Sequence, residues 1–226
     1  MDDRENEKAA AFAAKVAPIA AALTAETGQL WTVEPCHGWG ASLQCDTGEA
    51  EPFRLFLWDG HRYAKRTGAA DCKIQWPQDS RDGRTGAGMD GRAWQVVGYN
   101  ETEPKAAVSL DRDPRAVARD LLRRVITPGR PLFTAALARK AERNSSRDAG
   151  HALACELAAL LKLPAPERQE GRDYSLNCYG KSGAIEYGTV RVSEGGSYVY
   201  LERFSVKPGA AARILAAMIT PTDGEG

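Results

Sequence analysis

Apolar side chains recur at helical spacing near the N-terminus, over residues 5–26. Four of them fall three or four positions apart and form one stripe: Phe12, Val16, Ile19 and Leu23. This period is typical of a helix that packs on one side. Pro18 lacks a backbone N–H and crowds the preceding turn, so we expect it to kink or split the helix. Gly28 is the expected stop.

Short apolar segments then predict strands at residues 30–33, 39–45, 53–58, 61–66, 72–76, 93–99 and 106–110. Asp59-Gly60 lies between two of them and favours the positive φ angles of a two-residue type I′ turn. We therefore expect a tight hairpin there. Residues 77–91 are rich in Gly, Asp and Arg, a composition that cannot bury a core, so we predict a mobile loop.

Helical spacing returns after Asp113, which is an expected N-cap, and Pro114 suits the first helical position. The buried side is predicted to comprise Val117, Leu121, Leu122 and Val125. Pro128-Gly129 is expected to end this helix. We expect a further helix over residues 132–143, a polar connection over 144–148, and a helix over 150–163 that ends before Pro164-Ala-Pro166, with apolar side chains at Leu153, Leu157, Leu160 and Leu161.

The C-terminal part is predicted to form a strand over residues 174–179 and a long hairpin, 184–193 with 197–206, across Glu194-Gly-Gly. Alternation would place these residues of the last strand on one face: Tyr198, Tyr200, Phe204 and Val206. The other face would carry Val199, Leu201, Arg203 and Ser205. A final helix is expected from Pro208 to before Pro221.

Two internal matches suggest a repeat. Ser42-Leu-Gln-Cys45 reappears as Ser175-Leu-Asn-Cys178, and the helices after Pro114 and Pro208 both end in Ile-Thr-Pro. We therefore predict an α+β protein of two related helix–antiparallel sheet–helix units, which can pair into one pseudo-symmetric body. The first repeat would span residues 1–143, with an inserted hairpin and loop at about 59–93, and the second 144–226. Chance similarity in an Ala-rich chain is the alternative.

Charge and cysteine content narrow the function classes. Lys+Arg and Asp+Glu both total 30, which argues against a dedicated nucleic-acid coating protein but leaves room for a local basic patch. The 5 cysteines form no Cys-x-x-Cys pair, which favours a reducing cytoplasmic setting. The acidic N-terminus does not resemble a targeting peptide, and no apolar run approaches the length of roughly 20 residues that a membrane helix needs.

Residues that could carry chemistry are scattered. Cys36-His37, His61 and Cys72 lack the paired short spacing of structural zinc sites. Adjacent strand residues point to opposite faces, so Cys36 and His37 do not suit a nucleophile–base pair. The stretch Gly83-Arg-Thr-Gly-Ala-Gly88 lacks the Gly-Lys-Ser/Thr ending of a phosphate-binding loop. We expect no catalytic residue, no metal and no cofactor.

Candidate binding residues fall in three groups. Arg115, Arg119 and Arg123 recur every four residues and should form a stripe on the exposed side of their helix. The insertion contributes basic and aromatic residues that could hold phosphates and stack bases: Arg62, Arg66, Arg84, Tyr63 and Trp76. Tyr187, Tyr198 and Tyr200 would form an aromatic face of the second sheet for a partner. The alternatives are a solvated basic surface, because acids interrupt each basic run, and tyrosines packed beneath helices.

The segment from Ser109 to Pro128, Ser-Leu-Asp-Arg-Asp-Pro-Arg-Ala-Val-Ala-Arg-Asp-Leu-Leu-Arg-Arg-Val-Ile-Thr-Pro, resembles uncharacterised proteins of actinobacterial phages and Streptomyces mobile elements. The shared features are a strand, an Asp-Pro helix start, an Arg-Arg pair and a proline after the helix, and the likeness covers residues 105–143. It implies a mobile-element setting and no catalytic residue. A doubled helix–sheet–helix unit is also similar in outline to the TATA-binding-protein fold, by analogy alone.

These features lead us to expect a non-enzymatic accessory protein of a phage or mobile element, located in the host cytoplasm. It would bind and modulate another macromolecule, foremost a DNA-processing or defence enzyme. Direct nucleic-acid binding through the basic insertion and the arginine stripe is the alternative, and a hydrolase or nuclease is the third reading. The sequence leaves the oligomeric state open.

Overall fold

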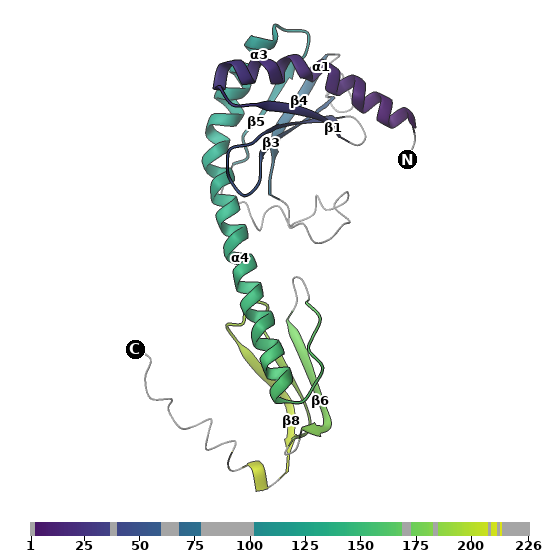
Figure 1. Cartoon of the computed structure of the whole chain (residues 1–226), viewed down its shortest axis with the longest axis vertical. Coiled ribbons are helices and arrows are strands. Elements are labelled where there is room, and N and C mark those ends of the chain that lie inside the picture. Colours follow the sequence, from purple (N-terminus) through teal and green to yellow (C-terminus); the bar gives the residue numbers. More distant parts are fainter. Residues whose placement is uncertain are drawn as a thin grey trace, which may run out of the picture. The chain divides into compact units, whose positions relative to one another are not determined.

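The computed structural model describes residues 3–36, 40–59, 68–77, 102–168, 173–182, 185–207, 209–211 and 213. The chain divides into two compact units, Met1–Lys140 (unit 1) and Ala141–Gly226 (unit 2). Each unit contains an antiparallel sheet with a helix against it, so the predicted α+β class is confirmed. Figure 1 shows both sheets and the helices that belong to them.

The sheet of unit 1 is a meander in which each described strand pairs with the next one in the chain. Its strands are β1 (Trp31–Cys36), β2 (Gly40–Cys45), β3 (Phe53–Asp59), β4 (Ala69–Gln75) and β5 (Lys105–Ser109). Burial alternates along β3 because successive side chains point to opposite faces: Phe53, Leu55 and Leu57 are buried, and Arg54 and Phe56 are half-buried. The buried face carries the core of this unit.

The first helix, α1 (Asp3–Thr27), lies against β1 and β2 and runs unbroken through Pro18, so the predicted split does not occur. Gly28 has φ +69° and donates its N–H to the carbonyl of Thr24, which confirms it as the stop. Among the described residues, the stretch Arg4–Thr27 is long and apolar enough to cross a membrane by length and composition. The expectation that no such run exists is therefore wrong, because alanines fill the gaps between larger apolar residues. In unit 1 the side chains of Val16 and Leu23 are buried in the core.

The tight hairpin predicted at Asp59-Gly60 is wrong. One edge of β3 pairs with β4, in the register Trp58↔Asp71 and Asp59↔Ala70, and the other edge pairs with β2. Both edges of β3 are therefore occupied by described strands, which contradicts the predicted pairing of β3 across a two-residue turn. Residues 60–67 and the predicted strand 93–99 lie outside the described part, as does the loop 77–91 apart from Pro77.

The helices expected after Asp113 are joined. Helix α3 (Pro114–Leu121) passes into a π-helical segment, η2 (Leu122–Ile126), and then into α4 (Thr127–Leu160) without a break. A proline ring clashes with the carbonyl four residues earlier in an α-helix. The wider π turn precedes Pro128 and relieves this crowding, with the N–H of Thr127 bonded to the carbonyl of Leu122. The predicted stop at Pro128-Gly129 and the predicted polar connection at 144–148 are therefore wrong.

The start of α3 agrees with its sequence signals. Asp113 accepts a hydrogen bond from the N–H of Ala116 at 3.1 Å, and Pro114 occupies the first turn. The predicted inner side is buried at Val117, Leu121 and Val125. These contacts place the opposite side of α3 in solvent.

Unit 2 contains the C-terminal part of α4 and a sheet of β6 (Tyr174–Ser182), β7 (Ile185–Val192) and β8 (Val199–Val206), paired in that order. The predicted hairpin between β7 and β8 is confirmed. Lys162 at φ +55° ends α4, with N–H bonds from Lys162 to Ala159 and from Leu163 to Ala158. Leu160 is exposed, against the prediction that it packs inward. Most of the predicted C-terminal helix lies outside the described residues.

The two matched four-residue segments lie in β2 and β6, where Cys45 and Cys178 are both buried. From β2 the chain makes three further antiparallel steps to β5, whereas from β6 it makes two to β8. The chain therefore leaves the two sheets in opposite directions relative to the matched strands. The duplication is not shown by this topology.

Candidate protein-binding face of unit 2

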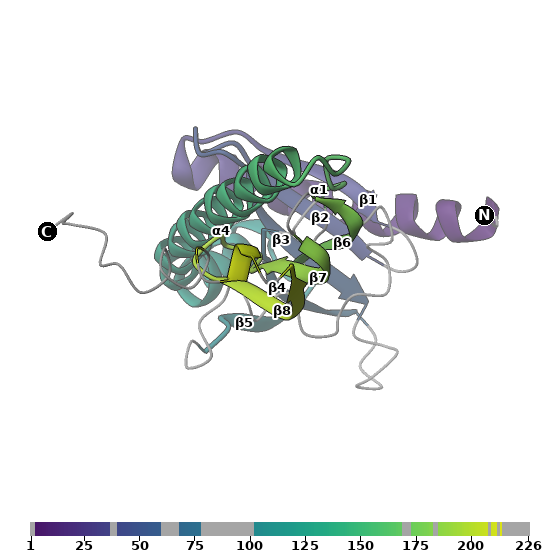
Figure 2. The ribbon, with the colours of Figure 1, turned by 90° about the horizontal axis from the view of Figure 1, so that it is seen from below.

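One face of the sheet in unit 2 is open and rich in tyrosine. The other face, with Leu176 and Val190, packs against Ala154 and Ala158 of α4 and forms the core of this unit. Side chains alternate between the two faces, so the remaining positions point away from that core. Tyr187 on β7 is 53% exposed, and near or on β8, Tyr198 is 65% and Tyr200 42% exposed. We call these three side chains the tyrosine face. Figure 2 shows the three strands in order, with β8 at the outside.

A β-bulge decides which residues of β8 belong to the tyrosine face. The register shifts between Tyr187↔Ser205 and Thr189↔Glu202, so β8 has one residue too many opposite Gly188. Arg203 is the extra residue of the bulge and has φ +51°. The prediction that Phe204 shares a face with Tyr200 is therefore wrong: beyond the bulge Phe204 packs on the core of unit 2.

Close packing at Gly188 fixes this bulge. A Cβ added at this glycine would lie 2.7 Å from the ring of Phe204, which is closer than side chains pack. No simple alternation of apolar residues reveals such a bulge, although the glycine inside the strand pattern is a signal for one.

Charged groups lie at the tyrosine face, but their charges are paired with one another. The Arg191 guanidinium lies 4.9 Å from the ring centre of Tyr200 and pairs with Glu202 at 3.1 Å and Asp173 at 3.4 Å. The rings of Tyr198 and Tyr200 are 6.3 Å apart. The cation is thus balanced by two carboxylates, and the surface that remains is aromatic with hydroxyl tips. Surfaces of this composition are typical of the centres of protein–protein interfaces.

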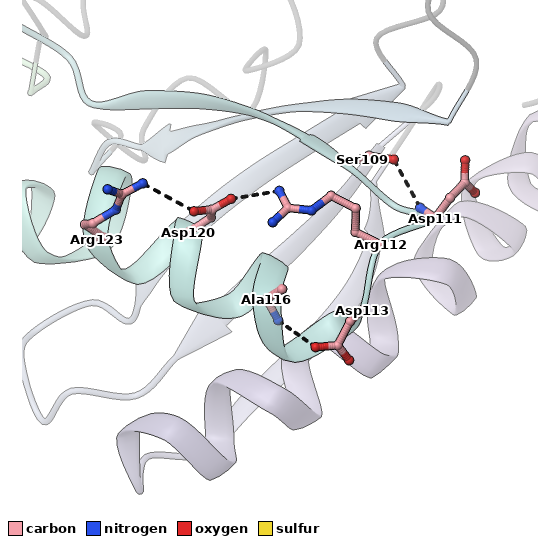
Figure 3. Close-up of polar contacts among 7 residues, drawn as sticks. All are labelled: Ser109, Asp111, Arg112, Asp113, Ala116, Asp120 and Arg123. Carbon is pink, nitrogen blue, oxygen red and sulfur yellow. Dashed lines mark hydrogen bonds and ion pairs between the residues drawn. The ribbon is translucent and has the colours of Figure 1, made fainter.

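The arginine stripe is exposed as its spacing predicts, but two of its cations are already paired. Arg119 contacts Glu26 at 2.9 Å, and Arg123 contacts Asp120 at 3.4 Å. Arg112 also contacts Asp120, at 2.8 Å, as Figure 3 shows. Hydrogen bonding from Arg112 is the largest cause that holds the pKa of Asp120 below its usual value. Arg115 makes no ion pair within the described part of the chain.

The aromatic and basic residues expected in the insertion do not assemble into a described site. Arg62, Tyr63, Arg66 and Arg84 lie outside the described residues. Trp76 is described and half-buried: it packs on the core of unit 1 and its Nε1–H donates to Glu103 at 3.1 Å. Its ring therefore has a structural place in unit 1.

An aromatic pair that sequence reasoning missed lies on the second face of the unit 1 sheet. The rings of Phe56 and Trp58 stack with centres 5.6 Å apart, and the Lys73 ammonium lies 5.5 Å from the Trp58 ring. A Cβ at Gly40 would lie 2.8 Å from the Phe56 ring, so the glycine admits this ring. Alternation with the buried Leu55 and Leu57 is the signal that could have found the pair. The side chains are half-buried, so they offer less surface than the tyrosine face.

Thiol chemistry is disfavoured at Cys36 and Cys72. Burial raises the pKa of the Cys72 thiol to about 12, and burial together with the charge of Glu34 raises that of Cys36. Both thiols therefore stay neutral near pH 7, and a neutral thiol is a poor nucleophile and metal ligand. Within the described residues no group of three or more His, Cys, Asp or Glu side chains could hold a metal ion. His37 and His61 lie outside those residues.

A contact between a cysteine and a histidine of unit 2 was not foreseen from the sequence. Cys155 Sγ lies 3.6 Å from Nε2 of His151, one turn earlier on α4. The same nitrogen lies 3.1 Å from the carbonyl oxygen of Pro166, an atom that can only accept, and a hydrogen on Nε2 satisfies it. The contact between His151 and Pro166 joins α4 to the chain segment that follows it.

The chain matches no known protein-family model, no curated protein sequence and no solved structure.

Proposed function

We propose that this chain is a non-enzymatic accessory protein that binds another protein through the tyrosine face of unit 2. The observation that carries the proposal is the exposure of Tyr187, Tyr198 and Tyr200 on one sheet face, beside an arginine whose charge is balanced. Tyrosine offers a large, stiff contact area and a hydroxyl that can be satisfied at a wet rim. Three rings that are exposed to water do not contribute to the core of unit 2, so a role in binding accounts for them better.

The partner class follows from charge. Nucleic-acid binding draws its affinity from unpaired cations that replace phosphate counterions. Arg191, Arg119 and Arg123 all have carboxylates within ion-pair distance, and the chain as a whole has formal net charge +0. A protein surface with an apolar centre fits the tyrosine face better than a phosphate backbone. Direct nucleic-acid binding through the arginine stripe remains the second candidate.

The biological setting is proposed from the resemblance of residues 105–143 to phage and mobile-element proteins. In that setting the bound protein would be a DNA-processing or defence enzyme of the host or the element, in the cytoplasm. A hydrolase or nuclease is the third candidate. The proposal of a non-enzymatic role is supported by neutral thiols at Cys36 and Cys72 and by the engaged Nε2 of His151.

We also propose a reduced form of the repeat. In this form the hairpin β2–β3 corresponds to β6–β7, together with the helix that precedes each, while the ends of the two sheets differ. Superposition of these elements tests it: if α1 and residues 141–160 of α4 fall on opposite faces of their hairpins, the proposed common origin is wrong.

The test of the binding proposal is a capture experiment from the native host with the tagged full chain, followed by reconstitution with the purified partner. Tyr187→Ala and Tyr198→Ala remove exposed rings only, so folding should be unchanged. We expect each variant to bind the partner at least about tenfold more weakly, since buried aromatic anchors at interfaces are worth about 2 kcal/mol or more. The control is Arg115→Ala, an exposed change in unit 1. Equal binding by all three variants would show that the tyrosine face is not the site.

A further inference from the structure

The outer edge of β8 carries four consecutive large side chains that are exposed on both faces of the strand. Tyr198 and Tyr200 lie on the tyrosine face, and Val199 and Leu201, on the α4 side, are 44% and 51% exposed. Among the described strands, only β7 pairs with β8. An apolar edge strand of this kind is a template for another strand, and proteins usually protect such edges with charges, prolines or short strands.

The alternation of hydrogen bonds along β8 shows which of its backbone N–H and C=O groups point away from β7. The N–H of Ser193 donates to the carbonyl of Tyr198 at 2.9 Å, so these two residues form a hydrogen-bonded pair. Such pairs alternate along an antiparallel ladder, and the register makes Arg191↔Tyr200 the next one. The N–H and C=O of Tyr200 therefore point to β7. Those of Val199 and Leu201 point outward, to the open edge.

We propose that β8 pairs antiparallel with β8 of a second copy of this chain, about a two-fold axis through Tyr200. Val199 then exchanges both backbone hydrogen bonds with Leu201 of the second copy, and the two Tyr200 side chains face each other. The axis is perpendicular to the sheet, so each side chain stays on its own face and the two sheets become one of six described strands. This pairing joins the tyrosine faces of two copies into one surface; its hydrogen bonds come from the backbone of Val199 and Leu201, which the proposed partner binding does not use.

The register follows from the limits of the regular strand. Gly196, at φ +70°, ends it on one side, and Arg203, at φ +51°, ends it on the other. Of the residues between these limits, Ser197 still belongs to the turn, which leaves 198–202 with their centre at Tyr200. With the axis at Val199, the paired residues would include the turn. With the axis at Leu201, they would include the bulge. If the axis passed between two residues, backbone N–H and C=O groups that point outward would face residues whose groups point inward, and no hydrogen bonds would form.

The side chains of this edge are self-complementary in the same register. Val199 lies beside Leu201 of the second copy on the α4 side, so two apolar groups cover each other. On the other face the hydroxyl of Tyr198 comes opposite the carboxylate of Glu202 of the second copy. A two-fold axis creates both contacts twice, as isologous interfaces require. The formal net charge of +0 means that two copies meet without net repulsion.

The first test is the mass of the full chain in solution by sedimentation or light scattering. We expect a dimer for the wild type and a monomer for Leu201→Lys, whose charge blocks the edge without disturbing β7. Tyr187→Ala, on the tyrosine face but away from the edge, should stay dimeric, and circular dichroism should show all three folded. A monomeric wild type, or a Leu201→Lys variant that stays dimeric, would overturn the proposal. Since partner capture is read separately, a failure here is distinct from a failure of the proposed function.

The second test reads the register by cross-linking, in a background where the half-buried thiols of Cys36 and Cys155 are replaced by serine. Facing residues of a non-hydrogen-bonded pair have Cα atoms about 4.5 Å apart, within the range of about 4.4–6.8 Å that a disulfide spans. Tyr200→Cys should therefore link to itself on oxidation. Tyr198→Cys and Glu202→Cys should link only when mixed. Dimers that form neither link would show that this register is wrong.

Discussion

Arg147 on α4 forms an ion pair with Glu194 in the turn between β7 and β8, and its side chain is almost fully buried. A buried guanidinium is tolerated only where a carboxylate and further polar groups satisfy it. The pair therefore holds the β7–β8 turn against the helix in unit 2. It also explains why the polar stretch 144–148 is helical: its charge is used in a tertiary contact rather than in solvent.

Gly150 leaves room for the β7–β8 turn to pack against α4, and we predict that Gly150→Ala destabilises unit 2. A Cβ at this position would overlap the carbonyl of Glu194, which belongs to the backbone and cannot turn aside. Overpacking of this kind costs about 1–3 kcal/mol, partly offset by the better helix propensity of alanine, about 1 kcal/mol. Urea unfolding of the variant should show a lower midpoint. Ser145→Ala, an exposed change one turn earlier, is the control and should leave the midpoint unchanged or raise it slightly.

The ion pairs around Asp120 predict a pH effect with a defined sign. Because Arg112 and Arg123 lower the pKa of Asp120 from the ordinary 3.8, the folded chain favours the ionised carboxylate. The resulting stabilisation is present above pH 3.8 and is lost as the pH falls through the lowered pKa. NMR titration of the Asp120 carboxyl should show this low value. In Arg112→Ala it should return toward 3.8; an unchanged titration would exclude Arg112 as the main cause.

Sequence reasoning succeeded where a signal is local. The cap at Asp113, the stop at Gly28 and the β7–β8 hairpin depend on neighbouring residues, and the structure confirms each. It failed where distant residues decide. Arg147 meets a glutamate 47 positions away, and the strand that pairs with β3 is β4, which begins at Ala69.

The candidate site shows the same division. The three tyrosines could be placed on the sheet of unit 2 from the sequence, but the bulge that separates Phe204 from Tyr200 depends on how Phe204 packs against Gly188. That packing fixes both the composition of the tyrosine face and the length of the regular edge. The open edge itself depends on which strand pairs with β8, and a sequence pattern does not state this pairing.

The buried thiol of Cys72 predicts slow alkylation. Its pKa of about 12 leaves a very small thiolate fraction at about pH 8, and its side chain is buried in the core of unit 1. Folded protein treated with iodoacetamide should therefore keep Cys72 free, and urea should expose it to full modification. Mass spectrometry of the peptides reads both states. Rapid modification of Cys72 in the folded chain would mean that the β3–β4 region opens easily.

The last prediction separates the two leading partner classes through the arginine stripe. Arg119 and Arg123 already contact carboxylates, so only Arg115 offers an unpaired charge to a phosphate among these three. We therefore expect binding of single- and double-stranded DNA and RNA to be weaker than about micromolar near physiological salt, where non-specific binding is typically weak. The chain with Arg115, Arg119 and Arg123 replaced by Gln should bind equally weakly. Glutamine removes charge without setting a carboxylate against Glu26, so the fold is preserved. Fluorescence anisotropy at about 50 and 200 mM salt provides the measurement. Micromolar or tighter binding that falls about 10³-fold between these salts, and that is lost in the Gln variant, would establish nucleic acid as the partner instead.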